Sequence, residues 1–164
     1  MSASVYNVLF VCNGNSARSI LAEGLMNHLG QGRFRGYSAG SHPTGVVNPF
    51  ALEALEKLGL PTGGFRSKSW DEFARDGAPA LHFVFTVCDK AAGELCPVWP
   101  GQPMTAHWGV ADPAAGEVSD ERRQKLVREA AVILTRRIEY LLALPIDKLD
   151  AVGLQQAVRD IGQR

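Results

Sequence analysis

The sequence predicts an α/β fold in which helices cover both faces of a parallel sheet. Short runs of β-branched and aromatic apolar residues alternate with longer segments whose apolar residues recur every three or four positions. Strands that alternate with helices are joined by βαβ crossovers, and these produce a parallel sheet with helices on both faces. A length of 164 residues suits one domain, so residues 1–164 are expected to form a single unit.

Turn-forming residues bound each expected element in the first half of the chain. Gly30 and Gly59 are natural helix stops, and the pair Asn48-Pro49 is suited to open a helix. The run VYNVLFV is typical of a strand buried on both faces. In order, the expected elements are a strand at Val5–Val11, a helix at Arg18–Leu29, a strand at Phe34–Ala39 and a helix from Pro49 to Leu58.

The second half contains the longest periodic segment, Ser119–Leu144, which is expected to be a helix that Pro145 ends. Residues Asp89–Pro103 hold three prolines and two glycines, so they are expected to form a loop. The other expected elements are a short helix at Ser69–Arg75 with Ser69 as N-cap, strands at Leu81–Val87 and Met104–Val110, and a helix at Leu149–Ile161.

Composition excludes several classes of partner. Lys plus Arg and Asp plus Glu are equal at 17 each, so no overall field favours nucleic acid or a membrane surface. No apolar segment approaches the length of a membrane span, and Met1–Tyr6 lacks the pattern of a signal peptide. We therefore expect a cytoplasmic monomer that binds neither nucleic acid nor membrane.

An odd number of cysteines, namely Cys12, Cys88 and Cys96, predicts reduced and reactive thiols rather than a disulfide framework. The alternative is that each is a small buried apolar residue, which is common for free cysteine. Zinc binding is a poor interpretation, because the spacing of Cys88 and Cys96 is wrong and no histidine cluster accompanies them. No bound metal or cofactor is expected.

Three reactive side chains fall at the same edge of the expected sheet. Cys12 follows the first strand, Cys88 follows a later strand, and Asp112 follows the last one. Ligands of such folds bind at the carboxyl ends of the strands. This convergence predicts a site, although an Asp before a proline is often only a turn residue and Cys88 has a plausible buried role.

The segment Cys12–Arg18 has the chemistry of an oxyanion-binding loop. Its small residues can turn successive backbone N–H groups inward, and the following helix adds its N-terminal donors. Arg18 can contact two oxygens of a bound anion, and Ser19 can donate a hydrogen bond to the sulfur of Cys12. These donors favour a Cys12 thiolate, so its pKa is expected to lie below that of free cysteine. The expected anion-binding residues are Asn13, Gly14, Asn15, Ser16, Ala17, Arg18 and Ser19.

Other interpretations of the loop are less favoured. Cys12 could be buried with Arg18 facing solvent, but the small residues between strand and helix argue against this. A nucleotide-binding P-loop would end in Gly-Lys-Ser/Thr, which is absent here, and no glycine-rich dinucleotide motif follows a strand. The loop is therefore expected to hold a phosphate-like anion.

The segment VLFVCNGNSARSILAE, residues 8–23, resembles the start of the low-molecular-weight protein tyrosine phosphatase family, and within it the arsenate reductase branch. Asp112-Pro113 matches the position of the general acid in that family. The resemblance spans nearly the whole chain. It implies a three-layer α/β/α fold with a four-stranded parallel sheet, Cys12 as nucleophile, Arg18 as oxyanion clamp and Asp112 as proton donor.

By the same resemblance, arsenate is reduced through a thiol relay. Cys12 attacks arsenate, Cys88 attacks Cys12 and expels arsenite, and Cys96 attacks Cys88 before an external thiol such as thioredoxin reopens the disulfide. The gap from Cys88 to Cys96 is one residue longer than in the thioredoxin-coupled branch, and the loop carries an unusual CPVWPGQP stretch. A glutathione and glutaredoxin route, in which Cys96 is unnecessary, therefore stays open. Asn15, Glu23, Ser38 and Ser69 match positions that support the loop or hold a potassium ion in some relatives, so a bound potassium ion is a hypothesis for this chain.

Two other functions compete with reduction. A phosphotyrosine or small-molecule phosphatase would use Cys12, Arg18 and Asp112 alone, but Asp112-Pro113 is followed by Ala-Ala-Gly rather than by aromatic residues that would wall a phenyl ring. Asn13 is also polar where the phosphatase branch tends to be apolar. A phosphate-binding module without turnover would not need nucleophile, clamp and acid together. Reduction of arsenate is the favoured prediction.

Overall fold

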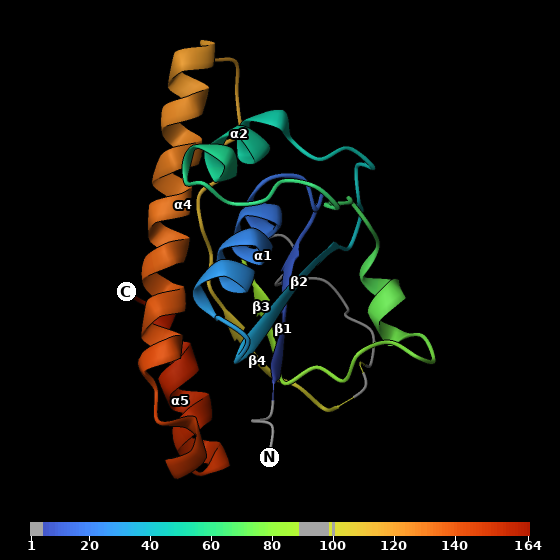
Figure 1. Cartoon of the computed structure of the whole chain (residues 1–164), viewed down its shortest axis with the longest axis vertical. Helices are drawn as coiled ribbons and strands as arrows, with labels where there is room; N and C mark the ends of the chain where they lie inside the picture. The colour runs from blue at the N-terminus through green and yellow to red at the C-terminus, as the bar shows by residue number, and fades with distance from the viewer. Residues whose placement is uncertain (1–4, 89–98, 100) are drawn as a thin grey trace.

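A four-stranded parallel sheet lies at the centre of the structure, a computed structural model that describes residues 5–88, 99 and 101–164. The strands lie in the order β2-β1-β3-β4 and all pairs are parallel, which confirms the predicted fold class (Figure 1). Their bounds are β1 Tyr6–Cys12, β2 Phe34–Gly40, β3 Phe83–Thr86 and β4 Met104–His107.

Helices flank the sheet. The helix α1 packs on β1 and β2 and also contacts α2 and α4, whereas the short 3-10 helix beside β2 lies on the side away from α4 (Figure 1). α5 contacts both β4 and α4. The α-helices are α1 Arg18–Leu29, α2 Pro49–Lys57, α4 Asp120–Ala143 and α5 Ala151–Ile161, and the 3-10 helices are Trp70–Ala74 and Ile146–Lys148.

Side-chain caps fix where several helices begin, as the sequence predicts. Asn48 Oδ1 accepts a hydrogen bond of 2.8 Å from the N–H of Phe50, and Pro49 occupies the first helical position of α2. Ser119 Oγ accepts one of 3.1 Å from the N–H of Arg122 at the start of α4. These caps place the helix starts within a residue of the prediction.

The last two strands are shorter than predicted. The apolar run Leu81–Val87 suggests a longer strand than the observed β3, and β4 ends at His107 instead of Val110. Backbone pairing nevertheless continues irregularly beyond both ends, because the N–H of Trp108 donates to Thr86 O (2.7 Å) and that of Val110 donates to Val87 O (3.0 Å). This irregular stretch leads directly to Asp112.

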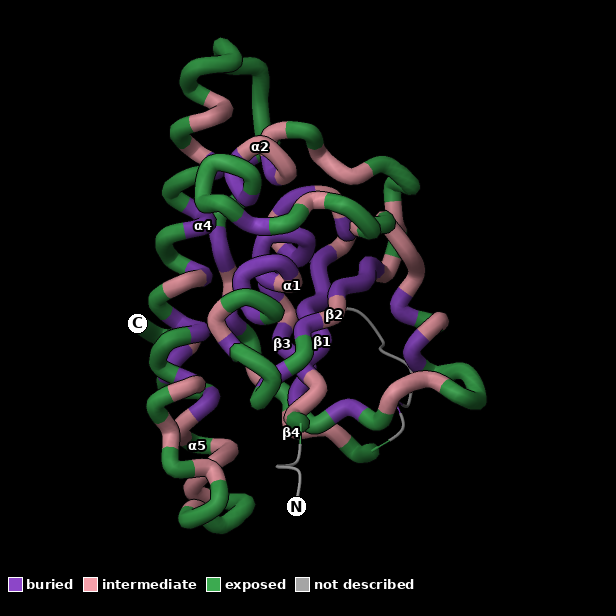
Figure 2. The backbone as a smooth tube through the Cα atoms, viewed as in Figure 1, coloured by how far each residue is buried: buried purple, intermediate pink, exposed green. Residues whose placement is uncertain are grey.

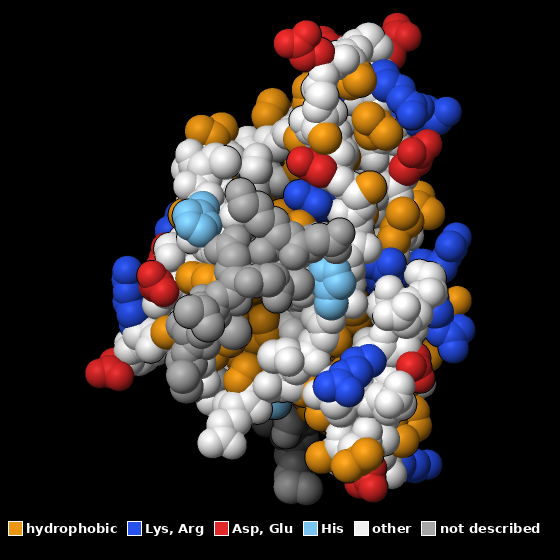
Figure 3. Space-filling view, turned by 180° about the vertical axis from the view of Figure 1, so that it is seen from behind, with side chains coloured by type: hydrophobic (Ala, Val, Ile, Leu, Met, Phe, Trp, Pro, Cys, Tyr) orange, Lys and Arg blue, Asp and Glu red, His pale blue; other side chains and the backbone are white. Residues whose placement is uncertain are grey.

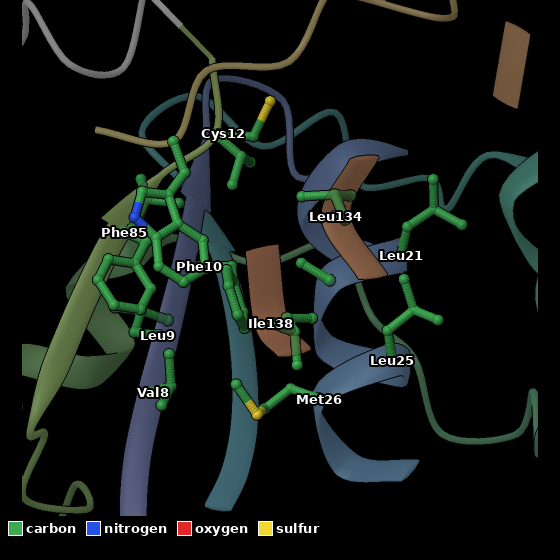
Figure 4. Close-up of a cluster of buried hydrophobic side chains, with 14 of the residues drawn as sticks. Val8, Leu9, Phe10, Cys12, Leu21, Leu25, Met26, Phe85, Leu134 and Ile138 are labelled. Atoms are coloured by element: carbon green, nitrogen blue, oxygen red, sulfur yellow. The ribbon is translucent and has the colours of Figure 1, made fainter. Parts of the chain in front are cut away.

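The core is densest around β1. Residues 8–11 are completely buried, as expected for a strand covered on both faces. Figure 2 shows that buried residues dominate β1, β2, β3 and α1, while burial alternates along α4. Phe85 and Trp108 stack with ring centroids 3.8 Å apart, and Trp108 Nε1 donates to Val158 O (2.9 Å). Cys12 lies at one end of this cluster, at the carboxyl end of β1 (Figure 4).

The outer face of α4 mixes apolar and basic side chains. Val132 and Ile133 are exposed and lie beside Arg128 and Arg136, and the space-filling view shows apolar and basic side chains next to one another along this edge (Figure 3). In the parts of the chain that the structure describes, no helix is both long and apolar enough to cross a membrane.

Candidate active site

The loop from Cys12 to Arg18 turns its carbonyl groups outward. Backbone N–H groups of neighbouring segments donate hydrogen bonds to these carbonyls: His42 N donates to Asn13 O (2.9 Å), Thr44 N donates to Gly14 O (3.0 Å), and Asn48 N donates to Ser16 O (2.9 Å). Adjacent C=O and N–H groups of a peptide unit point in opposite directions, so outward carbonyls direct the following N–H groups into the loop. The loop therefore has the form of an anion-binding nest.

Asn15 adopts an unusual backbone conformation within this loop. Its φ is +46°, in the left-handed region that asparagine tolerates better than most residues, and it is completely buried. Its Nδ2 donates to Ser19 Oγ (2.8 Å), and its Oδ1 accepts from the N–H of Lys68 (2.9 Å). Asn15 thus ties the loop to Ser19 and to the segment at Lys68. The hydrogen bond predicted from Ser19 to the Cys12 sulfur stays a prediction.

Cys12 and Cys88 lie side by side and are both buried, with 4% and 2% of their surface exposed. The hydrogen bond with the Cys88 thiol and then burial raise the pKa of Cys12, and together they outweigh the lowering by the Arg18 charge and the Gly14 N–H. The prediction that the pKa of Cys12 lies below that of free cysteine is therefore wrong for this conformation. Its physical cause is a second thiol that the loop sequence alone does not reveal.

Arg18 and Asp112 face each other across the site. Arg18 Nη2 is 3.8 Å from Asp112 Oδ2, and Arg18 Nη1 donates to Val110 O (2.9 Å). Asp112 Oδ1 accepts from the N–H of Ala114 (2.9 Å), so a turn holds the carboxylate. The Arg18 side chain is 15% exposed and that of Asp112 is 45% exposed, so Asp112 lies at the rim.

A cavity of about 550 Å³ joins these groups. Among the described residues, Cys88 lines this cavity and Cys12 does not. Its described lining consists of Asn13, Arg18, Cys88, Gly109, Val110, Ala111 and Asp112. The structure thus brings together Arg18, Cys88 and Asp112 beside the Cys12 loop, while Cys96 lies outside the described residues.

Two arginines of α4 hold the segment that carries Asp112, and neither was predicted from the sequence. Arg123 donates to the carbonyls of Pro113 (2.7 Å), Ala115 (3.0 Å) and Gly116 (2.6 Å). Arg137 Nη1 donates to Gly109 O (2.9 Å). One signal was available for Arg123: a basic residue in the first turn of a helix opposes the helix dipole and calls for another partner.

The residues matched to a potassium site are already engaged with other protein groups. Ser38 Oγ donates to Glu23 Oε1 (2.6 Å), Ser69 Oγ accepts from the N–H of Asp71 (3.1 Å), and Asn15 has the two partners described above. Lys68 Nζ lies 3.7 Å from Glu23 Oε1. Within the described part of the chain, the one buried side-chain nitrogen or oxygen without a partner is Arg137 Nε, a donor. This arrangement does not fit a bound cation.

An inward-turned ring of N–H groups beside a cysteine, faced by an arginine and a carboxylate, defines a class of proteins that bind tetrahedral oxyanions next to a thiol. The family model described as low molecular weight phosphotyrosine protein phosphatase matches residues 7–144, and the chain belongs to this family.

Several arsenate reductases are similar to this chain in sequence or in structure. An arsenate reductase from Halalkalibacterium halodurans is 35% identical over 133 residues, which make up 80% of this chain and 91% of that protein. A solved arsenate reductase in the phosphate-binding state is similar with a TM-score of 0.69 and 29% identity, covering 85% of this chain and 98% of that one. A thioredoxin-dependent arsenate reductase from Corynebacterium glutamicum has a TM-score of 0.59 and 25% identity, covering 87% of this chain and 62% of that one.

Proposed function

We propose that this chain is a thiol-dependent arsenate reductase. The observation that carries the proposal is the second thiol: Cys88 lines the oxyanion cavity and hydrogen-bonds to Cys12. A phosphatase of this family needs only the nucleophile, the arginine and the acid, whereas reduction needs two further electrons. Two adjacent thiols can supply them by forming a disulfide.

The first step forms a bond between sulfur and arsenic. Arsenate binds in the loop with its oxygens on the inward N–H groups and on Arg18. The Cys12 thiolate attacks the arsenic, and a hydroxyl of arsenate leaves as water with a proton from Asp112. Arsenic stays As(V), and the product is a Cys12–arsenate thioester. The Cys88 thiol and burial raise the pKa of Cys12 overall, and the Arg18 charge and the Gly14 N–H oppose this rise and so stabilise the thiolate that this step requires.

The second step transfers the electrons. The Cys88 thiolate attacks Cys12 Sγ, a sulfur–sulfur bond forms, and the sulfur–arsenic bond breaks. Its electron pair stays on arsenic, which becomes As(III) and leaves as arsenite. Two thiols have been oxidised to one disulfide, so the electrons balance. Asn13 N–H donates to Cys88 Sγ (3.1 Å), a contact that favours the attacking thiolate.

An external thiol then regenerates the enzyme. In the relay that the family resemblance implies, Cys96 attacks Cys88 and leaves a Cys88–Cys96 disulfide. Thioredoxin is the reductant we propose, since one related structure is that of a thioredoxin-dependent arsenate reductase. The glutathione and glutaredoxin route is the alternative, and a Cys96→Ser variant distinguishes them, because only the thioredoxin route requires Cys96. We also propose that the chain acts as a monomer in the cytoplasm, where such reductants keep thiols reduced.

The second candidate is phosphate ester hydrolysis through a Cys12 phosphocysteine. Membership in the phosphatase family favours it, and the same loop cannot readily distinguish phosphate from arsenate. Against a phosphotyrosine substrate, none of the described residues lining the cavity is aromatic. A small inorganic anion therefore suits the site better than an aryl phosphate.

A single-turnover reaction of reduced protein with arsenate tests the proposal. We expect stoichiometric arsenite and a Cys12–Cys88 or Cys88–Cys96 disulfide, mapped by mass spectrometry. The matched variant Cys88→Ala is expected to release no arsenite yet to keep any aryl phosphate hydrolysis, because the phosphatase steps do not use Cys88. Three free thiols and no arsenite in the wild type, with hydrolysis dependent on Cys12, would make the chain a phosphatase.

A further inference from the structure

A partly buried ion pair beside the oxyanion loop is unused by the reaction proposed above. Lys68 Nζ lies 3.7 Å from Glu23 Oε1, and the two side chains are only 10% and 17% exposed. Ser38 Oγ donates a hydrogen bond of 2.6 Å to the same Glu23 oxygen, and Lys68 Nζ donates one of 3.0 Å to Arg66 O. The pair therefore joins α1, β2 and the segment at residues 66–68.

The main chain of Lys68 ties this pair to the oxyanion loop. The Lys68 N–H donates to Asn15 Oδ1 (2.9 Å), and Lys68 O accepts from the N–H of Gly40 (2.8 Å). Asn15 in turn donates to Ser19 Oγ (2.8 Å). Because the backbone is held at both its N–H and its carbonyl, the ammonium is anchored next to Glu23 by the same contacts that support the loop.

Each member of the pair needs the charge of the other. A buried carboxylate without a counter-charge is strongly destabilised, and so is a buried ammonium. Burial raises the pKa of Glu23, which the Ser38 hydrogen bond and the Lys68 charge oppose. Burial also lowers the pKa of Lys68, which the Glu23 charge opposes. Removing either charge therefore leaves the other poorly compensated.

We propose that the Lys68 ammonium is the permanent counter-charge of Glu23 and takes the place of the potassium ion that some relatives bind, so that this chain holds its oxyanion loop without a bound cation. Unit charges of the same sign a few ångströms apart repel, and a potassium ion next to Glu23 would meet the Lys68 ammonium. The proposal concerns support of the loop and holds whether the substrate is arsenate or a phosphate ester.

Thermal unfolding of the full chain in potassium chloride and in tetramethylammonium chloride, at equal ionic strength, tests this. Wild type is expected to melt at the same temperature in both salts. Lys68→Ala is expected to melt lower in tetramethylammonium and to recover in potassium, because the shortened side chain leaves room for a small cation beside Glu23. Recovery of about 4 °C is expected when potassium is at roughly ten times its Kd.

The matched control is Lys57→Ala. Lys57 also pairs with a glutamate, Glu53 at 3.1 Å, but its side chain is 54% exposed. Such a pair contributes little, so neither a marked loss of melting temperature nor a response to potassium is expected. Glu23→Gln combined with Lys68→Ala should also give no potassium response, because no buried carboxylate remains to bind the ion.

Two results would overturn the proposal. One is a wild type that melts higher in potassium than in tetramethylammonium, since a cation site would then exist beside Lys68. The other is a Lys68→Ala variant as stable as Lys57→Ala and indifferent to potassium. Should Lys68→Ala not fold, the double variant decides: it is expected to fold because it has no buried charge at this point, and its failure to fold would contradict the proposal.

Discussion

Replacing Arg123 by alanine is expected to slow turnover by loosening the segment that carries Asp112. The guanidinium of Arg123 donates three hydrogen bonds, of 2.6 to 3.0 Å, to main-chain carbonyls on the C-terminal side of Asp112. Asp112 itself keeps its turn contact with Ala114 and its proximity to Arg18 in such a variant. Arg123 is thus a positioning residue, and its loss should misplace the acid without removing it.

The size of the effect follows from the contacts. Hydrogen bonds to a charged group contribute about 1.5–3 kcal/mol each when well buried, but Arg123 is only half-buried and two of its three contacts are exposed. We take the net stabilisation of the ordered segment as about 2 kcal/mol, which limits the loss of rate to roughly 30-fold. The expected loss is about 10-fold, below the 10²–10⁴-fold that general acid catalysis contributes and that Asp112→Asn would remove.

Single-turnover arsenite release, measured across pH, checks this prediction alongside calorimetric binding of inorganic phosphate. Arg122→Ala is the matched control, because Arg122 is exposed in the same helical turn and the charge change is identical. Phosphate affinity should hold in Arg123→Ala while the rate falls, and Arg123→Lys should recover part of the rate. A rate equal to that of the Arg122 variant, or as low as that of Asp112→Asn, would refute the positioning role.

Three further variants test the loop itself. Cys12→Ser is expected to abolish turnover but to keep phosphate binding, since the backbone donors remain; calorimetry measures this, and lost binding would argue against the nest. Cys88→Ala is expected to lower the pKa of Cys12, because the Cys88 thiol is the largest influence that raises it. The pH dependence of Cys12 alkylation by iodoacetamide reports that pKa, which an unchanged profile would contradict. Gly40→Ala would place a Cβ 2.7 Å from Asn13 O and 3.0 Å from Asn15. This crowding is expected to lower the free energy of unfolding by about 2 kcal/mol, which denaturant titration measures. A free energy of unfolding equal to that of the wild type would show that the loop can shift.

The elements that local pattern controls were predictable from the sequence. The helix Arg18–Leu29 has its predicted bounds, and Ser119 caps the long helix that Pro145 ends. Strand ends were harder to predict, because an apolar run looks the same where the ladder is regular and where it becomes irregular. At Trp108 and Val110 single backbone hydrogen bonds persist after the regular strand has ended.

The residues of the site also differ in how well the sequence predicts them. Cys12 and Arg18 lie in one short segment, and parallel topology brings Cys88 and Asp112 to the same edge, so spacing and fold class together predict them. Arg123 and Lys68 act through main-chain carbonyls or through a residue far along the chain. Such contacts leave little pattern in a sequence, because any carbonyl can accept them.

The failed pKa prediction for Cys12 and the proposed relay have one origin. The Cys88 thiol raises the pKa of Cys12 because it lies within hydrogen-bonding distance, and the same closeness lets it attack the Cys12 sulfur later. Once Cys12 carries arsenic it no longer titrates, so the two thiols stop competing for negative charge. The Asn13 N–H, which already donates to Cys88 Sγ, then favours a thiolate on Cys88 alone. Formation of the adduct thus passes the nucleophile's role from the first thiol to the second, so arsenite release from the pre-formed adduct should depend on the ionisation of Cys88.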